Sequence, residues 1–447
     1  MGFKKKVGRR RFVAGTAALS SAMVAAPFVR GAYAAGKLSL GLWDHWVPNA
    51  NGATEKLIKE WGEKQKVDVQ IDFITSQGNK LLLTTAAEAQ AKSGHDIIAM
   101  NTFLPARYAD QLVPVNAEMD KLIAENGKVN DTVEYLGKID GKWLAIPATI
   151  GSQIKGPCSR IDYMKEYAKI DVQAMYPAGA EPKDKDWTLD TFMKAAEACH
   201  KGGHPFGIGL GTTSDCVDTI GAIFHSFGAV LVDAKGEIVV KNDQVRQALD
   251  WYKKLMAFLP EDVPAWDDSS NNKFLVSGQA SMIMNPPSAW AVAKRDAPKV
   301  AENCWTHPFP AGPKGRFGPF LPFFWGIWSF GKNVPAAKDL LMYMSTAASA
   351  EKMVEASGGY DLPSFEKLTK FKVWAEAEPP KGTLFSYPDP YHTQTLSIAA
   401  APAPHKIAEQ IYNLGLQTQM AVRYFKGEPL EKTLDWASNE LEGYMRN

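Results

Sequence analysis

The sequence lacks several features that would define a function class. Its 447 residues carry 50 Lys and Arg against 49 Asp and Glu, so no strong field of one sign recruits nucleic acid or an anionic membrane. Cysteine is scarce: Cys158, Cys199, Cys216 and Cys304 are not arranged in Cys-x-x-Cys pairs. We interpret them as buried apolar residues, although one disulfide in an oxidising compartment remains possible. We expect no metal site and no cofactor.

Motifs of common enzyme classes are also missing. The chain has no Gly-Lys-Ser/Thr phosphate loop, no Rossmann glycine spacing and no Gly-x-Ser-x-Gly elbow. The adjacent carboxylates Asp267 and Asp268 lie in a stretch rich in Ser and Asn, which indicates solvated turn residues. The sequence therefore gives no direct sign of catalysis.

The first 34 residues have the order of a secretory signal. A basic start at 4–11 precedes an apolar stretch at 12–27, and Ala32-Tyr33-Ala34 supplies the small-x-small cleavage pattern. The apolar stretch is shorter than the roughly 20 residues of a permanent membrane span. Residues 9–13 (RRRFV) resemble the twin-arginine export motif, with ordinary secretion as the alternative. We predict a signal peptide at 1–34 and a mature, mildly acidic, periplasmic protein.

Strands and helices alternate after the signal. Apolar residues alternate with polar ones at 38–42 and 67–73, and 96–100 reads as a buried strand. Helical spacing covers 53–65 and 79–92 between them. This order predicts a parallel sheet with right-handed crossovers, whose ligands bind at the carboxyl ends of the strands. Those ends are 43–46 (WDHW), 75–77 (TSQ) and 101–103 (NTF), where aromatic and short polar side chains converge.

The rest of the chain continues the mixed pattern. Strands are predicted at 206–210 and 280–285. Helices are predicted at 187–201, from Asn242 onward, and at 335–346, 349–357, 405–425 and 429–445. The fold class is therefore α/β.

Six short motifs occur in an order that resembles the family 1 extracellular solute-binding proteins, the periplasmic receptors of ATP-binding-cassette sugar importers. They are 94–98 (GHDII), 139–147 (IDGKWLAIP), 187–192 (WTLDTF), 227–229 (FGA), 274–282 (FLVSGQASM) and 310–315 (PAGPKG). The resemblance implies the two-lobed type II periplasmic-binding-protein fold, with discontinuous lobes, hinge crossings and a ligand cleft between them. Lobe 1 would comprise 35–146 and 286–330, and lobe 2 would comprise 147–285 and 331–447.

The function implied by the resemblance requires no chemistry on the ligand. Contacts from both lobes would favour a closed state that a membrane permease reads. The expected partners are a small carbohydrate and that permease, with no nucleic acid, and the protein is expected to be a monomer. An exported carbohydrate-active enzyme is the alternative; Asp44 and Asp361 are then the candidate carboxylates.

A sugar needs flat aromatic surfaces for its C–H faces and fixed polar groups for its hydroxyls. On the resemblance and the predicted strand ends, the expected ligand-binding residues are Trp43, Asp44, His45, Trp46, Gln77, Asn101, Phe103, Ser152, Asp215, Asp218, Ser288, Trp290, Trp325, Gly359, Tyr360 and Asp361.

Some of these residues have a plain structural alternative. Asp215 and Asp218 would equally cap the N-terminus of a helix. Of Trp325 and Trp328, one is expected in the core, and we expect Trp325 in the cleft.

A phosphorylated ligand would need basic residues in the cleft. The candidates are Lys80, Arg107 and Lys155, each of which could instead face solvent. Because such residues are few, we expect a neutral sugar or sugar alcohol.

Overall fold

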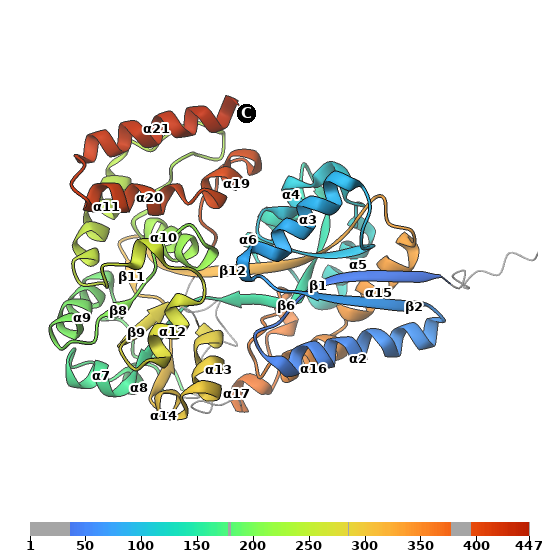
Figure 1. Ribbon diagram of the computed structural model, residues 1–447, viewed down its shortest axis with the longest axis horizontal. Coiled ribbons are helices and arrows are strands. Elements are labelled where there is room, and N and C mark those ends of the chain that lie inside the picture. Colours follow the sequence, from blue (N-terminus) through green and yellow to red (C-terminus); the bar gives the residue numbers. More distant parts are fainter. Residues whose placement is uncertain (1–35, 178–179, 285, 377–394, 447) are drawn as a thin grey trace, which may run out of the picture.

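The computed structural model describes residues 36–177, 180–284, 286–376 and 395–446. The predicted signal peptide lies outside these residues. Figure 1 shows two α/β halves joined by long strands that run from one to the other. Within the described residues, no helix is both long and apolar enough to cross a membrane.

The first half is built on a seven-stranded sheet. Its parallel strands are β1 (Lys37–Trp43), β2 (Asp68–Ile74) and β3 (Ile97–Asn101), in the order β2-β1-β3. The crossover helices α2 (Pro48–Gln65) and α3 (Lys80–Ala91) connect them. These strands and helices confirm the alternating pattern predicted from the sequence. Helix α2 starts five residues earlier than the predicted start at 53, with Pro48 in its first turn.

Two long strands cross between the halves. Strand β12 (Gly315–Ile327) pairs antiparallel with β3 over one part of its length. It also pairs antiparallel with β6 (Ala145–Ile154). The short strands β11 (Ala311–Gly312) and β13 (Thr395–Ser397) also pair with β12. Because β6 and β12 are hydrogen-bonded to each other, they form one connection between the halves (Figure 1).

The second half contains a four-stranded sheet in the order β10-β7-β9-β8. Its strands are β7 (Pro157–Arg160), β8 (Phe206–Gly207), β9 (Met282–Met284) and β10 (Cys304–Thr306). Around it lie α7 (Ile161–Glu166), α8 (Val172–Met175), α9 (Leu189–Lys201), α10 (Ser214–Phe227), α11 (Asp243–Met256), α12 (Ser270–Val276), α13 (Pro286–Asp296) and α14 (Pro298–Ala301). The Asn242 side chain caps α11 by accepting from the Val245 N–H at 2.8 Å, as expected for a helix that starts there.

The remaining elements complete both halves. In the first half are α4 (Leu104–Arg107), α5 (Asn116–Asn126), α6 (Asp131–Gly137), the β4 (Lys138–Ile139) and β5 (Lys142–Trp143) hairpin, α15 (Val334–Met344) and α16 (Ala347–Ala356). The short helix α17 (Val373–Glu376) follows them in the chain. The C-terminal helices are α19 (His405–Asn413), α20 (Leu416–Phe425) and α21 (Leu430–Arg446). The predicted single helix at 405–425 is wrong, because Gly415 adopts a left-handed conformation (φ 59°) that separates α19 from α20.

The division of the chain between the halves differs from the predicted lobes. Strand β10 belongs to the second sheet, so the chain does not return to the first half until β12. Helices α15 and α16 then pack against α2 in the first half (Figure 1). The predicted boundaries at 286 and 331 placed these segments in the opposite lobes, because the pairing partners of a short strand cannot be read from local sequence.

All four cysteines are buried free thiols, which confirms the prediction that they are buried.

Candidate ligand-binding site

A cleft of about 250 Å³ lies at the carboxyl ends of β1 and β3, where residues from both halves meet. Seven of the predicted residues line it: Trp43, Trp46, Asn101, Phe103, Asp215, Ser288 and Tyr360. Residues outside the predicted ligand-binding set also line it, among them Gln153, Asp268, Phe323 and Tyr412. The position of the cleft agrees with the rule that α/β sheets bind ligands at their carboxyl edge.

Several aromatic rings line the cleft. The ring of Trp43 lies 5.2 Å from that of Phe323 and 6.3 Å from that of Tyr360, measured between centroids. Across the cleft, Phe103 of the first half lies 5.4 Å from Tyr412 of α19. These rings come from five separate segments, so the fold rather than any one motif assembles them. Such surfaces suit the C–H faces of a sugar.

The buried polar atoms of this lining that have no hydrogen-bond partner among the described residues include the indole Nε1 of Trp43, a donor, and the amide Oε1 of Gln153, an acceptor. The side chains of Trp43 and Gln153 are at least nine-tenths buried. A buried polar group without a partner costs free energy that a bound hydroxyl would recover, because a hydroxyl both donates and accepts.

Behind the cleft, a fully buried lysine holds two aspartates of α10. The Nζ of Lys155 lies 2.7 Å from Asp215 Oδ1 and 2.9 Å from Asp218 Oδ2. Burial tends to lower the pKa of Lys155, but the carboxylates outweigh it and raise the pKa above its usual value. Burial, together with the nearby charge of Asp268, raises the pKa of Asp215 to about 6, although the Lys155 ammonium favours its charged form.

The N-terminus of α10 is satisfied from another loop. Oδ1 of Asp268 accepts from the Asp215 N–H at 3.1 Å, and its Oδ2 accepts from the Ser214 hydroxyl at 3.2 Å. The interpretation of Asp268 as a solvated turn residue is therefore wrong. The capping alternative for Asp215 and Asp218 is also wrong, because their carboxylates face Lys155. A contact between α10 and a loop more than 50 residues away leaves no local signal in the sequence.

The other predicted residues do not line the cleft. They are Asp44, His45, Gln77, Ser152, Asp218, Trp290, Trp325, Gly359 and Asp361. Asp44 is exposed and accepts from the Asn51 amide, and Gln77 is exposed in a short 3₁₀ turn. Gly359 uses its carbonyl to accept from the Trp374 indole.

The register of β12 explains why Trp325 is absent from the cleft. Phe323 pairs with Asn101, the last residue of β3, whereas Trp325 pairs with Ala99. Two residues of strand place Trp325 about 6.6 Å deeper in the sheet, where its side chain is 2% exposed. The expectation that Trp325 lies in the cleft is therefore wrong, and Phe323 occupies that edge instead. Trp328 is in the core, as expected.

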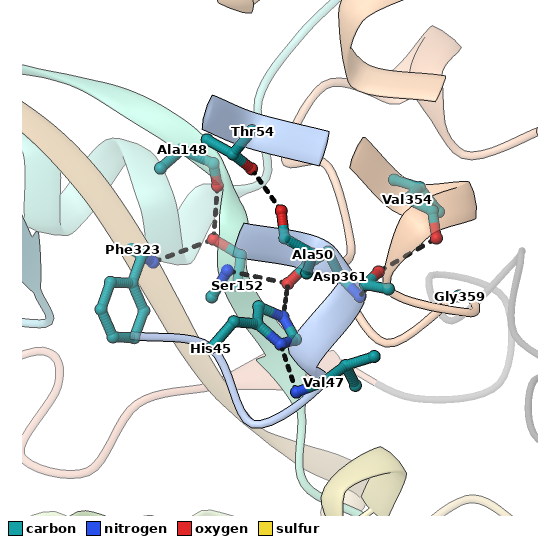
Figure 2. A network of polar contacts seen from close by, with 12 residues as sticks. His45, Val47, Ala50, Thr54, Ala148, Ser152, Phe323, Val354, Gly359 and Asp361 are labelled. Atoms are coloured by element: carbon teal, nitrogen blue, oxygen red, sulfur yellow. Dashed lines mark hydrogen bonds and ion pairs between the residues drawn. The ribbon is translucent and has the colours of Figure 1, made fainter. Parts of the chain in front are cut away.

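The alternation of side chains along β6 places Ser152 and Gln153 on opposite faces of the strand. Neighbouring residues of a strand point to opposite faces, so only one of them reaches the cleft. The Ser152 hydroxyl donates to the Ala148 carbonyl at 2.7 Å and accepts from the Phe323 N–H at 2.9 Å (Figure 2). Ser152 thus stabilises the β6–β12 connection, and Gln153 faces the cleft.

A larger cavity of about 760 Å³ lies next to the cleft. Trp46 and Tyr360 line both spaces, whereas Trp290 of α13 lines only the larger one. The Lys294 ammonium lies 4.8 Å from the Trp290 ring. The predicted stacking residue Trp290 is therefore outside the smaller cleft.

The comparisons with known proteins agree with this architecture. The sequence profile of the family described as bacterial extracellular solute-binding protein matches residues 56–379. The chain belongs to this family. A curated relative, described as a probable ABC transporter-binding protein of Deinococcus radiodurans, is 27% identical over 235 residues. That match covers 49% of this chain and 53% of the relative, so the solute-binding chain spans about half the length of the curated relative it matches.

Solved structures establish the two-lobed fold of this solute-binding protein. Maltose-bound MalE3 of T. maritima has a TM-score of 0.70 at 16% identity, covering 91% of this chain and 99% of that one. An ABC transporter solute-binding protein of Thermotoga lettingae, bound with α-D-tagatose, has a TM-score of 0.70 at 15% identity, covering 92% and 99%. At these identities the likeness concerns the fold alone, which is that of the sugar receptors of ABC transporters.

Proposed function

We propose that the protein is an exported, monomeric receptor that captures a neutral sugar or sugar alcohol between its lobes and delivers it to the permease of an ABC importer. The observation that carries this proposal is the cleft, which combines aromatic rings with the unpartnered donor of Trp43 and the unpartnered acceptor of Gln153. Two proteins of the same fold bind maltose and tagatose.

The size of the cleft supports a small ligand. Pockets for drug-sized ligands occupy roughly 300–1,000 Å³, and this cleft, at about 250 Å³, is just below that range. A sugar of one or two rings fits such a space.

The charges around the cleft support a ligand without phosphate. Among the described residues that line it, the charged side chains are Asp215 and Asp268, both acidic. The three basic candidates are engaged or remote: Lys155 is paired with two carboxylates, Arg107 lies 3.3 Å from Glu409, and Lys80 is exposed. An anion would meet these carboxylates, and the described residues that line the cleft supply no cation to offset the repulsion.

The position of the carboxylates supports binding without catalysis. A glycosidase places two carboxyl groups on opposite sides of the bond, roughly 5–10 Å apart. Of the two candidates named for that role, Asp44 is exposed and Asp361 is buried outside the cleft. Asp215 and Asp268 lie together on one side, joined by the Asp215 N–H.

We also propose that residues 1–34 direct export by the twin-arginine route. This rests on the residues 9–13 (RRRFV) and the apolar stretch after them. Changing Arg9 and Arg10 to Lys should abolish export by that route, whereas unimpaired export would indicate general secretion.

A thermal-shift screen of the mature protein tests the ligand class. Neutral sugars and polyols are compared with their phosphate esters, and we expect at least one neutral compound to raise the melting temperature. At 100 times its Kd a ligand stabilises by about 2.7 kcal/mol, which is a shift of several degrees. A screen in which only phosphorylated compounds stabilise the protein would contradict the proposal.

A further inference from the structure

Two predicted ligand contacts, His45 and Asp361, instead form a buried pair beside the cleft. His45 follows β1 and Asp361 follows α16, yet His45 Nε2 lies 3.1 Å from Asp361 Oδ1. Both side chains are fully buried, and neither residue lines the cleft. Figure 2 shows the pair between the start of α2, strand β6 and the segment after α16.

The hydrogen bonds assign the direction of this contact. The Val47 N–H donates to His45 Nδ1 at 2.8 Å, so Nδ1 is an acceptor and the proton of the neutral ring is on Nε2. His45 therefore donates to Asp361. The same carboxylate oxygen accepts from the Gly151 N–H of β6 at 2.8 Å. One oxygen thus joins the loop after β1 to a strand that crosses between the halves.

The imidazole ring lies between two rings of the cleft. Its centroid is 4.8 Å from that of Trp43 and 4.7 Å from that of Tyr360, which meets it edge-on. Both of those residues line the cleft. A change in the position of the imidazole would therefore displace both aromatic surfaces.

Gly151 permits this arrangement. Its φ of +91° is a backbone conformation that residues with a side chain rarely adopt. A Cβ at this position would lie 2.8 Å from the ring of Phe323, which is another aromatic residue of the cleft lining. The Asp361 carboxylate therefore binds β6 at the point where that strand supports Phe323.

We propose that His45 and Asp361 are positioning residues that set the aromatic surface of the cleft without touching the ligand. Asp361 fixes the imidazole relative to β6, and the imidazole fixes Trp43 and Tyr360. The effect on ligand binding rests on the proposed function, whereas the effect of the pair on the position of Trp43 can be tested without any ligand.

The ligand-free test uses Asp361→Ala and Asp361→Asn with the Trp43 indole signal in ¹⁵N-tryptophan NMR spectra, assigned through Trp43→Phe. Asn retains an oxygen that can accept from both His45 and Gly151, whereas Ala retains none. We expect Asp361→Ala to shift the Trp43 signal and leave most other indole signals in place, and Asp361→Asn to restore it. An unmoved Trp43 signal in Asp361→Ala, or an equal shift in both variants, would overturn the proposal.

The binding test uses a matched pair at His45, titrated with maltose and D-tagatose. His45→Asn places an acceptor near Nδ1 and keeps the Val47 contact, whereas His45→Gln places a donor near Nε2 and keeps the Asp361 contact. Both remove the ring. We expect affinity to fall in both variants, because both lose the ring, and to fall about tenfold further in His45→Asn, which also loses the Asp361 contact. Equal losses would contradict the role of the Asp361 contact. If neither sugar binds the wild type, the proposed function loses support, while the Trp43 signal still decides the positioning role.

Discussion

At the residue scale, the buried cluster of Lys155 with Asp215 and Asp218 makes the stability of the protein depend on pH. Lys155 directly follows β6, and the two aspartates are on α10, so this ion cluster ties the crossing strand to a helix of the second half. Buried ions are costly unless each finds a partner of opposite charge. Here one ammonium serves two carboxylates, and the balance depends on pH because Asp215 has a pKa of about 6.

Lys155→Met should destabilise the protein by about 3–5 kcal/mol at pH 8, because it leaves buried carboxylates without a cation. A carboxyl group whose pKa is higher in the folded than in the unfolded chain takes up a proton on folding. The variant should therefore recover part of its stability as the pH falls from 8 to 5. Urea denaturation at both pH values measures this difference.

Lys165→Met is the matched control. Lys165 pairs with Asp171 at 3.2 Å, but its side chain is 66% exposed, so we expect a loss below about 1 kcal/mol at either pH. If Lys155→Met were destabilised equally at pH 8 and pH 5, the raised pKa of Asp215 would be contradicted.

At the element scale, two tryptophans on different segments differ in which of the two cavities they line. Trp46, in the loop between β1 and α2, lines both, whereas Trp290 of α13 lines only the larger one. Both side chains are half-buried, so truncation should affect overall stability to a similar and limited extent.

Trp46→Ala should weaken binding of the neutral sugar selected by the thermal-shift screen by about 10–100-fold, and Trp290→Ala by less than about threefold. The reason is that a ligand of one or two rings is contained in the smaller cleft. Isothermal titration calorimetry measures both values. A loss in Trp290→Ala as large as that in Trp46→Ala would show that the ligand extends into the larger cavity.

The sequence predicts elements better than it predicts which of their residues reach the cleft. Alternation correctly indicated β1 and β2, the buried run at 96–100 correctly indicated β3, and the strand ends correctly pointed to Trp43, Asn101 and Phe103 as lining residues. The choice of Phe323 over Trp325 depends on the register between β12 and β3, which involves strands more than 200 residues apart. No local pattern encodes such a register.

At the scale of the whole molecule, the two halves contact each other through more than the crossing strands. Helix α19 reaches the first half, where Glu409 pairs with Arg107 and His405 stacks on Tyr135 at 4.7 Å. Both lobes contribute side chains to the cleft, so a ligand that touches both favours the closed arrangement. The sequence predicted the two-lobed fold through its family motifs, but not which segments belong to each lobe, because α15, α16 and β10 are assigned by packing and pairing.

The proposed function requires the lobes to close on a neutral sugar, and small-angle X-ray scattering of the mature protein measures this closure. The radius of gyration is measured alone, with the neutral sugar selected by the thermal-shift screen, and with its phosphate ester at the same concentration. We expect a smaller radius with the neutral sugar and no change with the ester. An unchanged radius with bound sugar, or a decrease with the ester alone, would contradict the proposed function.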